Sequence, residues 1–183
     1  MNADFITQLQ KNPPMAAAVV IALGLLLFVL ARYVIARALT GLAARTKSKY
    51  DDILLRNLHP NRMAWFAPLV VLYTNAFLFP AYQPILGKAA LFVILWLAVL
   101  TLLGLLSAIN EIYESRPSYN GVSIQSYLDI AKILFVVVGL ILSITLITGE
   151  SPVVLLTGLG ALAAVIMLIF QNTILSLVAS IQI

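Results

Sequence analysis

The feature that most constrains the fold is a stretch without a charged residue, from Ser151 to Ile183. As one straight α-helix it would measure roughly 50 Å, whereas the hydrocarbon core of a bilayer is about 30 Å thick. The stretch must therefore bend, tilt steeply or lie partly along the membrane interface. The polar triplet Gln171-Asn172-Thr173 separates two apolar segments. We predict that the helix breaks there.

Composition predicts a membrane protein throughout the chain. Hydrophobic residues make up 62% of the 183 residues and charged residues 10%, and the mean hydropathy is +1.05. A water-soluble domain of this size would need far more polar surface. We therefore predict an all-α integral membrane protein.

Hydropathy predicts five membrane-spanning helices. They cover residues 14–34, 64–82, 85–109, 130–147 and 151–170. The first four spans form an N-terminal membrane-embedded part, residues 1–150, and residues 151–183 form the last helix and its continuation. Beyond the predicted break, Thr173, Ser176 and Ser180 fall on one helical face. Such a weakly amphipathic segment suits a position along the cytoplasmic interface.

Basic residues predict the orientation in the membrane. Six of them lie between the first two spans: Arg37, Arg45, Lys47, Lys49, Arg56 and Arg62. The connections before the third and fifth spans have only Lys88 and Glu150, and the loop between the third and fourth spans adds Arg116. The positive-inside rule then places the first loop, the third–fourth loop and the C-terminus in the cytoplasm, with the N-terminus on the opposite side.

The sequence offers no arrangement typical of an enzyme. Cysteine is absent and His59 is the single histidine, which excludes thiolate and His-rich metal sites. Asp51 and Asp52 are adjacent, so on a helix they point about 100° apart and do not form an acid–base pair. Gly158-Leu159-Gly160 lacks the following lysine of a phosphate-binding loop. We expect no catalytic residue, no metal, no cofactor and no nucleic-acid partner.

Charged side chains are also missing from the predicted bilayer interior. The candidates all fall near span ends: Arg32, Lys88, Glu111, Asp129, Lys132 and Glu150. Coupled carriers need a titratable or ion-binding group at depth. Asn75, in the middle of the second span, suits an interhelical hydrogen bond as well as a solute site. A facilitator or carrier is therefore disfavoured but open. A non-conducting membrane scaffold or assembly subunit, which needs no such group, is a separate alternative and ranks above the carrier.

Small residues crowd the first half of the last helix and allow close approach of helix backbones. Gly160, Ala164 and Leu168 are spaced by four, so one face stays small for two turns and then presents a bulky apolar side chain. In a symmetric ring, Leu168 from every subunit would converge and close a pore by dewetting. Spacing alone leaves open that the small residues pack against another span of the same chain.

Three segments are similar to one known family. Residues 157–182 read TGLGALAAVIMLIFQNTILSLVASIQ and resemble the pore helix of the small-conductance mechanosensitive channels, especially the five-span miniconductance type. Residues 46–55, TKSKYDDILL, are similar to the first cytoplasmic loop of that family. Residues 149–152, GESP, are similar to the turn into its pore helix.

The resemblance implies a channel of the bacterial inner membrane that opens under membrane tension and relieves hypo-osmotic stress. It implies a homoheptamer surrounded by membrane lipids, with a periplasmic N-terminus. The subunits would pack through the small residues Gly158, Gly160, Ala161, Ala163 and Ala164. The constriction maps onto Leu168, with Ala164 one turn above, and the helix break maps onto Gln171-Asn172, where many relatives have glycine. Relatives continue into a cytoplasmic β domain and vestibule that this chain does not include, so we expect a fragment of a longer protein.

Overall fold

The computed structural model describes residues 9, 12–46, 49–115 and 123–181, and within these ranges the side chains of residues 38–51, 172–173 and 177–181 are left undescribed. All regular structure in this part of the chain is helical, which confirms the all-α class. Lys47, Arg116 and Gln182, which contributed to the predicted orientation and the family resemblance, lie outside the described residues.

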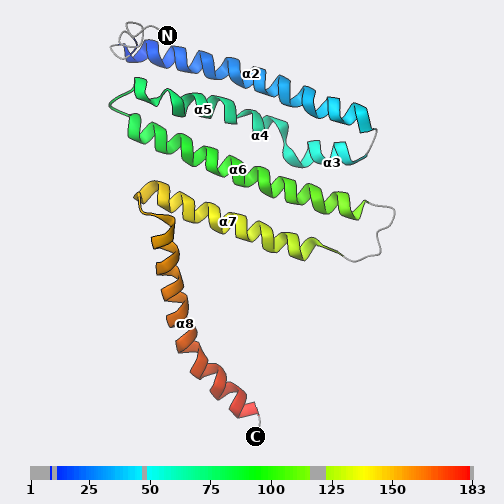
Figure 1. Cartoon of the computed structure of the whole chain (residues 1–183), viewed down its shortest axis with the longest axis vertical. Coiled ribbons are helices and arrows are strands. Elements are labelled where there is room, and N and C mark those ends of the chain that lie inside the picture. Colours follow the sequence, from blue (N-terminus) through cyan, green and yellow to red (C-terminus); the bar gives the residue numbers. More distant parts are fainter. Residues whose placement is uncertain (1–8, 10–11, 47–48, 116–122, 182–183) are drawn as a thin grey trace. The chain divides into compact units, whose positions relative to one another are not determined.

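The chain divides into two compact units, Met1–Gly139 and Leu140–Ile183. Unit 1 contains α2 (Pro13–Thr46), α3 (Lys49–Leu58), α4 (Pro60–Ala64), α5 (Phe66–Thr74), the 3-10 turn η1 (Ala76–Leu78), α6 (Gln83–Glu114) and the first part of α7 (Gln125–Thr148) (Figure 1). Unit 2 contains the end of α7 and α8 (Pro152–Ile181).

Four helices among the described residues are long and apolar enough to cross a membrane. They cover Pro13–Arg37, Gln83–Glu114, Gln125–Thr148 and Pro152–Ser176. The predicted spans 14–34, 85–109 and 130–147 lie within the first three of these helices, and the predicted span 151–170 overlaps the fourth. Four of the five predicted spans therefore correspond to long apolar helices.

The second predicted span, residues 64–82, is not a single helix. It is divided into the end of α4, α5 and η1, with a turn at Trp65. Pro68 lies four residues after Ala64 and cannot donate a backbone hydrogen bond to its carbonyl, which interrupts the helix at this point. The five-span prediction is thus not confirmed, because a hydropathy window registers apolar residues without the interruption.

The predicted first loop is largely helical. α2 continues beyond the membrane-length segment to Thr46, and α3 and α4 follow it. Apolar residues of α3 explain this, because Ile53 is buried and Leu54, Leu55 and Leu58 are half-buried. The predicted loop therefore packs against α6 through α3.

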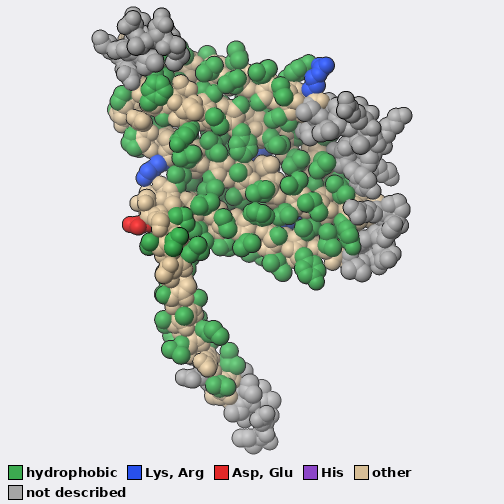
Figure 2. Space-filling model, in the orientation of Figure 1, with side chains coloured by type: hydrophobic (Ala, Val, Ile, Leu, Met, Phe, Trp, Pro, Cys, Tyr) green, Lys and Arg blue, Asp and Glu red, His purple; other side chains and the backbone are tan. Residues whose placement is uncertain are grey.

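The core of unit 1 lies between α2 and α5. Leu9, Ala16, Val20, Val71 and Leu78 form its buried apolar cluster. α2 packs against α5, and α5 packs against α6 (Figure 1). Outside this core, apolar side chains cover the visible face of unit 1, and the charged groups that stand out lie at its margins (Figure 2). An apolar exterior of this kind is suited to lipid contact.

Candidate functional site

The sequence between α7 and α8 fixes the start of α8. Gly149 has a φ of 81°, a left-handed conformation that favours glycine after a helix end, and its N–H donates to the Thr145 carbonyl at 2.8 Å. The Ser151 hydroxyl then accepts from the Val154 N–H at 3.3 Å, and Pro152 occupies the first helical position. The predicted start of the last helix at residue 151 agrees with this cap.

α8 presents small residues and Leu168 along one stripe. Because α8 is an uninterrupted helix through Ile181, Gly160, Ala164, Leu168 and Gln171, spaced by four, four and three, lie above one another on one face. Leu168 is 66% exposed, and no described side chain between Pro152 and Ser176 is buried. The stripe is therefore open to a partner.

The glycines of α8 have open space around them. A Cβ added to Gly158 or Gly160 would meet no atom within 4 Å. Their small size is thus not required by any contact within the described part of the chain. Ala161 lies beside the stripe, whereas Ala163 lies beyond its opposite edge, at 100° per residue.

The predicted break at Gln171-Asn172 is not confirmed. Both residues lie inside α8, which is helical on either side of them. Neither residue is proline or glycine, so both can keep the backbone N–H-to-carbonyl ladder intact.

Asn75, the residue on which a carrier would depend, bonds within its own segment. Its Nδ2 donates to the Val71 carbonyl at 2.9 Å and to Thr74 Oγ1 at 3.2 Å. The backbone N–H of Asn75 donates to the same Val71 carbonyl at 3.0 Å. These bonds close the C-terminal end of α5, a role that local capping by Asn explains.

We expect Asn75→Ala to lower the free energy of unfolding by about 1 kcal/mol, the usual net value of one intramolecular hydrogen bond. Thermal unfolding of the purified protein in detergent measures this loss. Solute uptake into proteoliposomes should stay at the background level in both proteins. Saturable uptake that Asn75→Ala removes, with stability unchanged, would contradict a capping role and support a carrier.

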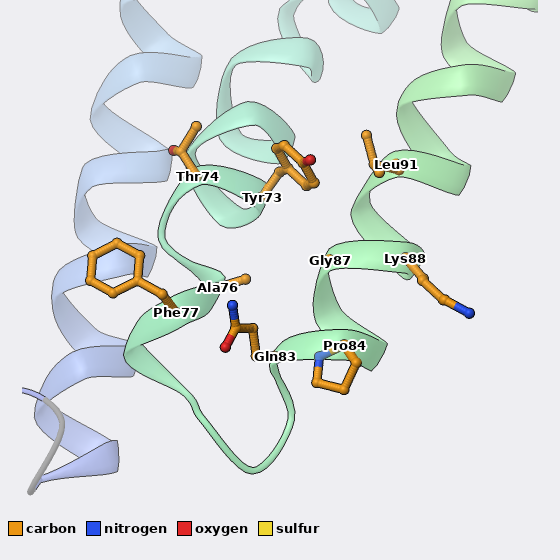
Figure 3. A pocket seen from close by; sticks show the side chains of 9 residues that line it. All are labelled: Tyr73, Thr74, Ala76, Phe77, Gln83, Pro84, Gly87, Lys88 and Leu91. Carbon is orange, nitrogen blue, oxygen red and sulfur yellow. The ribbon is translucent and has the colours of Figure 1, made fainter. Parts of the chain in front are cut away.

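A cavity of about 700 Å³ lies where α5, η1 and α6 meet. Its walls are Tyr73, Thr74, Ala76, Phe77, Gln83, Pro84, Gly87, Lys88 and Leu91. Figure 3 shows the Gln83 side chain between α5 and α6 and the Lys88 side chain directed away from α5. The lining includes no carboxylate and no histidine, and the described residues hold no group of three or more His, Cys, Asp and Glu suited to a metal ion.

A polar junction between α3 and α6 was not predicted from the sequence. Arg56 forms an ion pair with Glu111, and Asn57 Nδ2 donates to Glu111 Oε2 at 2.9 Å. The residues are more than fifty positions apart in the sequence, so spacing could not pair them. One available signal was Gly104, a glycine inside an otherwise apolar helix, because such a glycine often has a packing reason.

The fold and these surfaces define a helical membrane protein with an exposed small-residue stripe on its last long helix. No family model matches the chain, and no solved structure matches it.

Proposed function

We propose that the protein is an ion channel opened by membrane tension, with a pore lined by α8 from several copies of the chain. The observation that carries this proposal is the open stripe on α8. Gly158 and Gly160 have space around them that the described part of this chain does not fill, and Leu168 continues the face of Gly160. Small residues at these positions allow the helices of neighbouring copies to pack closely.

Leu168 supplies the gate in this proposal. A ring of leucine side chains forms an apolar constriction that excludes water while the helices are close. Ala164, one turn away on the same stripe, adds little bulk, so the seal depends mainly on Leu168. Gln171, on the next turn, presents an amide to the same side and offers water a polar surface once the ring widens.

Tension would act through the lipid-facing helices of unit 1. Their described side chains are largely apolar and exposed, as on α2, where Leu25, Leu26 and Val29 are each at least 60% exposed. Membrane tension favours the state that occupies more area, and this differential stability shifts the population toward an expanded state. The expanded state separates the α8 helices and opens the Leu168 ring.

The proposed setting is a bacterial inner membrane, with a periplasmic N-terminus, a cytoplasmic C-terminus and a homoheptameric assembly. The excess of basic residues between α2 and α5 supports the orientation. The resemblance of residues 157–182 to a known pore helix supports the location in a bacterial inner membrane and the assembly of seven subunits.

Gly160→Val is expected to abolish assembly while leaving the single chain folded, because a Cβ at residue 160 meets no atom of the same chain within 4 Å. Gly87→Val is the matched control, since a Cβ added to Gly87, on α6, likewise meets no atom within 4 Å. Crosslinking in native membranes measures the size of the assembly. Equal assembly of the two variants would show that α8 does not pack through its small face.

Survival of osmotic downshock tests the function. In a bacterial host without tension-gated channels of its own, the native protein should raise survival well above the empty vector. Gly160→Val should not, although it reaches the membrane. Survival equal to the vector, with assembled protein in the membrane, would favour the scaffold alternative.

A further inference from the structure

Three unusual features meet where α3 packs against α6. The backbone of α3 touches α6 at a glycine, the end of α3 is bound by a carboxylate of α6, and the residue that follows α3 has a left-handed backbone conformation. None of them belongs to α8 or to its small-residue stripe. Together they describe how the segment between α2 and α4 is held.

Gly104 permits the closest contact between the two helices. A Cβ added to Gly104 would overlap the carbonyl oxygen of Asn57 and would lie 3.3 Å from its carbonyl carbon. Since this carbonyl belongs to the backbone, it could give way only by moving α3. The docked position of α3 therefore depends on glycine at residue 104.

Glu111 holds the last turn of α3 with both carboxylate oxygens. Arg56 pairs with Oε1, and Asn57 Nδ2 donates to Oε2 at 2.9 Å. Asn57 Nδ2 also donates to the Ile53 carbonyl at 2.9 Å, which fixes the amide in place. The Arg56 side chain is 73% exposed and that of Glu111 is 34% exposed, so salt in the solvent can weaken the ion pair.

His59 connects α3 to α4 with a φ of 49°. This left-handed conformation is unfavourable for a residue with a side chain. Its Nδ1 lies 3.0 Å from the Asn57 carbonyl oxygen, the same atom that faces Gly104. The following Pro60 begins α4. The strained residue thus lies directly beside the contact that α3 makes with α6.

We propose that α3 is a detachable clamp that fastens the α2–α5 pair to α6 and is released by loss of the Glu111 contacts. α3 has ten residues, and isolated helices shorter than about 12–15 residues are marginal in water. Its helical state therefore depends on docking. Release frees His59 from its strained conformation, which lowers the energy needed to undock.

The clamp is a property of the fold and does not rest on the proposed function. Its consequence for opening does rest on it: the clamp fixes one end of the α2–α5 pair, and release lets that end move away from α6. In a tension-gated channel, such release would favour the expanded state.

Hydrogen exchange of the full chain in lipid nanodiscs tests the clamp. Glu111→Ala should accelerate exchange of the α3 amides about five- to tenfold, in keeping with loss of a charged hydrogen-bonded contact. Glu114→Ala is the matched control, because this substitution removes the same charge. Glu114 lies one turn further along α6 and accepts a hydrogen bond from Asn110 of its own helix. Glu114→Ala should leave α3 exchange unchanged.

Two further measurements test the ion pair itself. Arg56→Ala should accelerate α3 exchange less than Glu111→Ala does. KCl at about 0.5 M, where the Debye length is only a few ångströms, should also accelerate α3 exchange in the native protein.

Equal α3 exchange in the native, Arg56→Ala and Glu111→Ala proteins would overturn the clamp. Loss of protection in all helices of Glu111→Ala would also overturn it, since Glu111 would then hold the whole fold and not α3 alone. Hydrogen exchange does not depend on ion conduction. The clamp can therefore be tested even if the protein proves not to be a channel.

Discussion

Gly104→Ala is expected to destabilise the protein by about 2 kcal/mol, although alanine is the better helix former. Alanine in place of glycine improves helix propensity by about 1 kcal/mol. Here the added methyl group overlaps the backbone carbonyl oxygen of Asn57, and overpacking of this kind costs about 1–3 kcal/mol or more when backbone must move. The steric cost outweighs the gain, and α3 is pushed from α6.

Gly87→Ala provides the control for this experiment. Gly87 lies on the same helix, and a Cβ there meets no atom within 4 Å. Gly87→Ala should leave stability unchanged or raise it by up to about 1 kcal/mol. Denaturant unfolding in mixed micelles, followed by circular dichroism, measures both variants. Two variants of equal stability would show that Asn57 does not approach Gly104 as described.

Leu168→Ser is expected to produce a channel that opens too easily. Burying a leucine side chain among apolar neighbours contributes about 1.5–3 kcal/mol, and serine removes most of this from each copy in the closed ring. A change of about 1.4 kcal/mol alters an equilibrium tenfold. The open probability at a given suction should therefore rise at least about tenfold, with a resting leak that slows growth of the host.

Ile166→Ser is the matched control for Leu168→Ser. Residue 166 lies two positions from Leu168 on the same helix, about 200° around it, and its side chain is also exposed. The same polar substitution there faces away from the stripe. It should change the suction threshold much less than Leu168→Ser. Equal effects of the two substitutions would show that α8 does not orient the Leu168 stripe toward a pore.

The sequence predicted most of the long helices because their information is local. The apolar runs that contain 85–109 and 130–147 are bounded by polar residues, and they appear as α6 and α7. The last helix begins at Pro152, directly after the helix-ending Gly149 and the capping residue Ser151. Hydropathy and capping rules depend on nearest neighbours, which a sequence displays directly.

Two predictions about helix continuity are not confirmed, for related reasons. The second span was predicted as one helix over residues 64–82, whereas α4 ends at Ala64 and α5 begins at Phe66, because Pro68 lacks a backbone donor. The last helix was predicted to break at Gln171-Asn172, where the ladder is intact. Backbone chemistry decides such interruptions more than side-chain polarity does.

The α3–α6 junction could not be predicted, because its residues meet only in three dimensions. Arg56, Asn57 and Glu111 are polar residues outside or near the ends of predicted spans, and each alone suits solvent. Glycine at residue 104 was the one local sign of a close approach. The open stripe on α8, by contrast, follows from spacing as soon as the helix is known to be continuous.

Pressure-clamp recording from membrane patches that contain the native protein tests most directly whether the protein is a tension-gated channel. We expect current that appears reproducibly at a suction threshold, is absent from patches without the protein, and shifts to lower suction in Leu168→Ser. Silence up to rupture of the patch, with assembled protein shown to be present, would contradict this function.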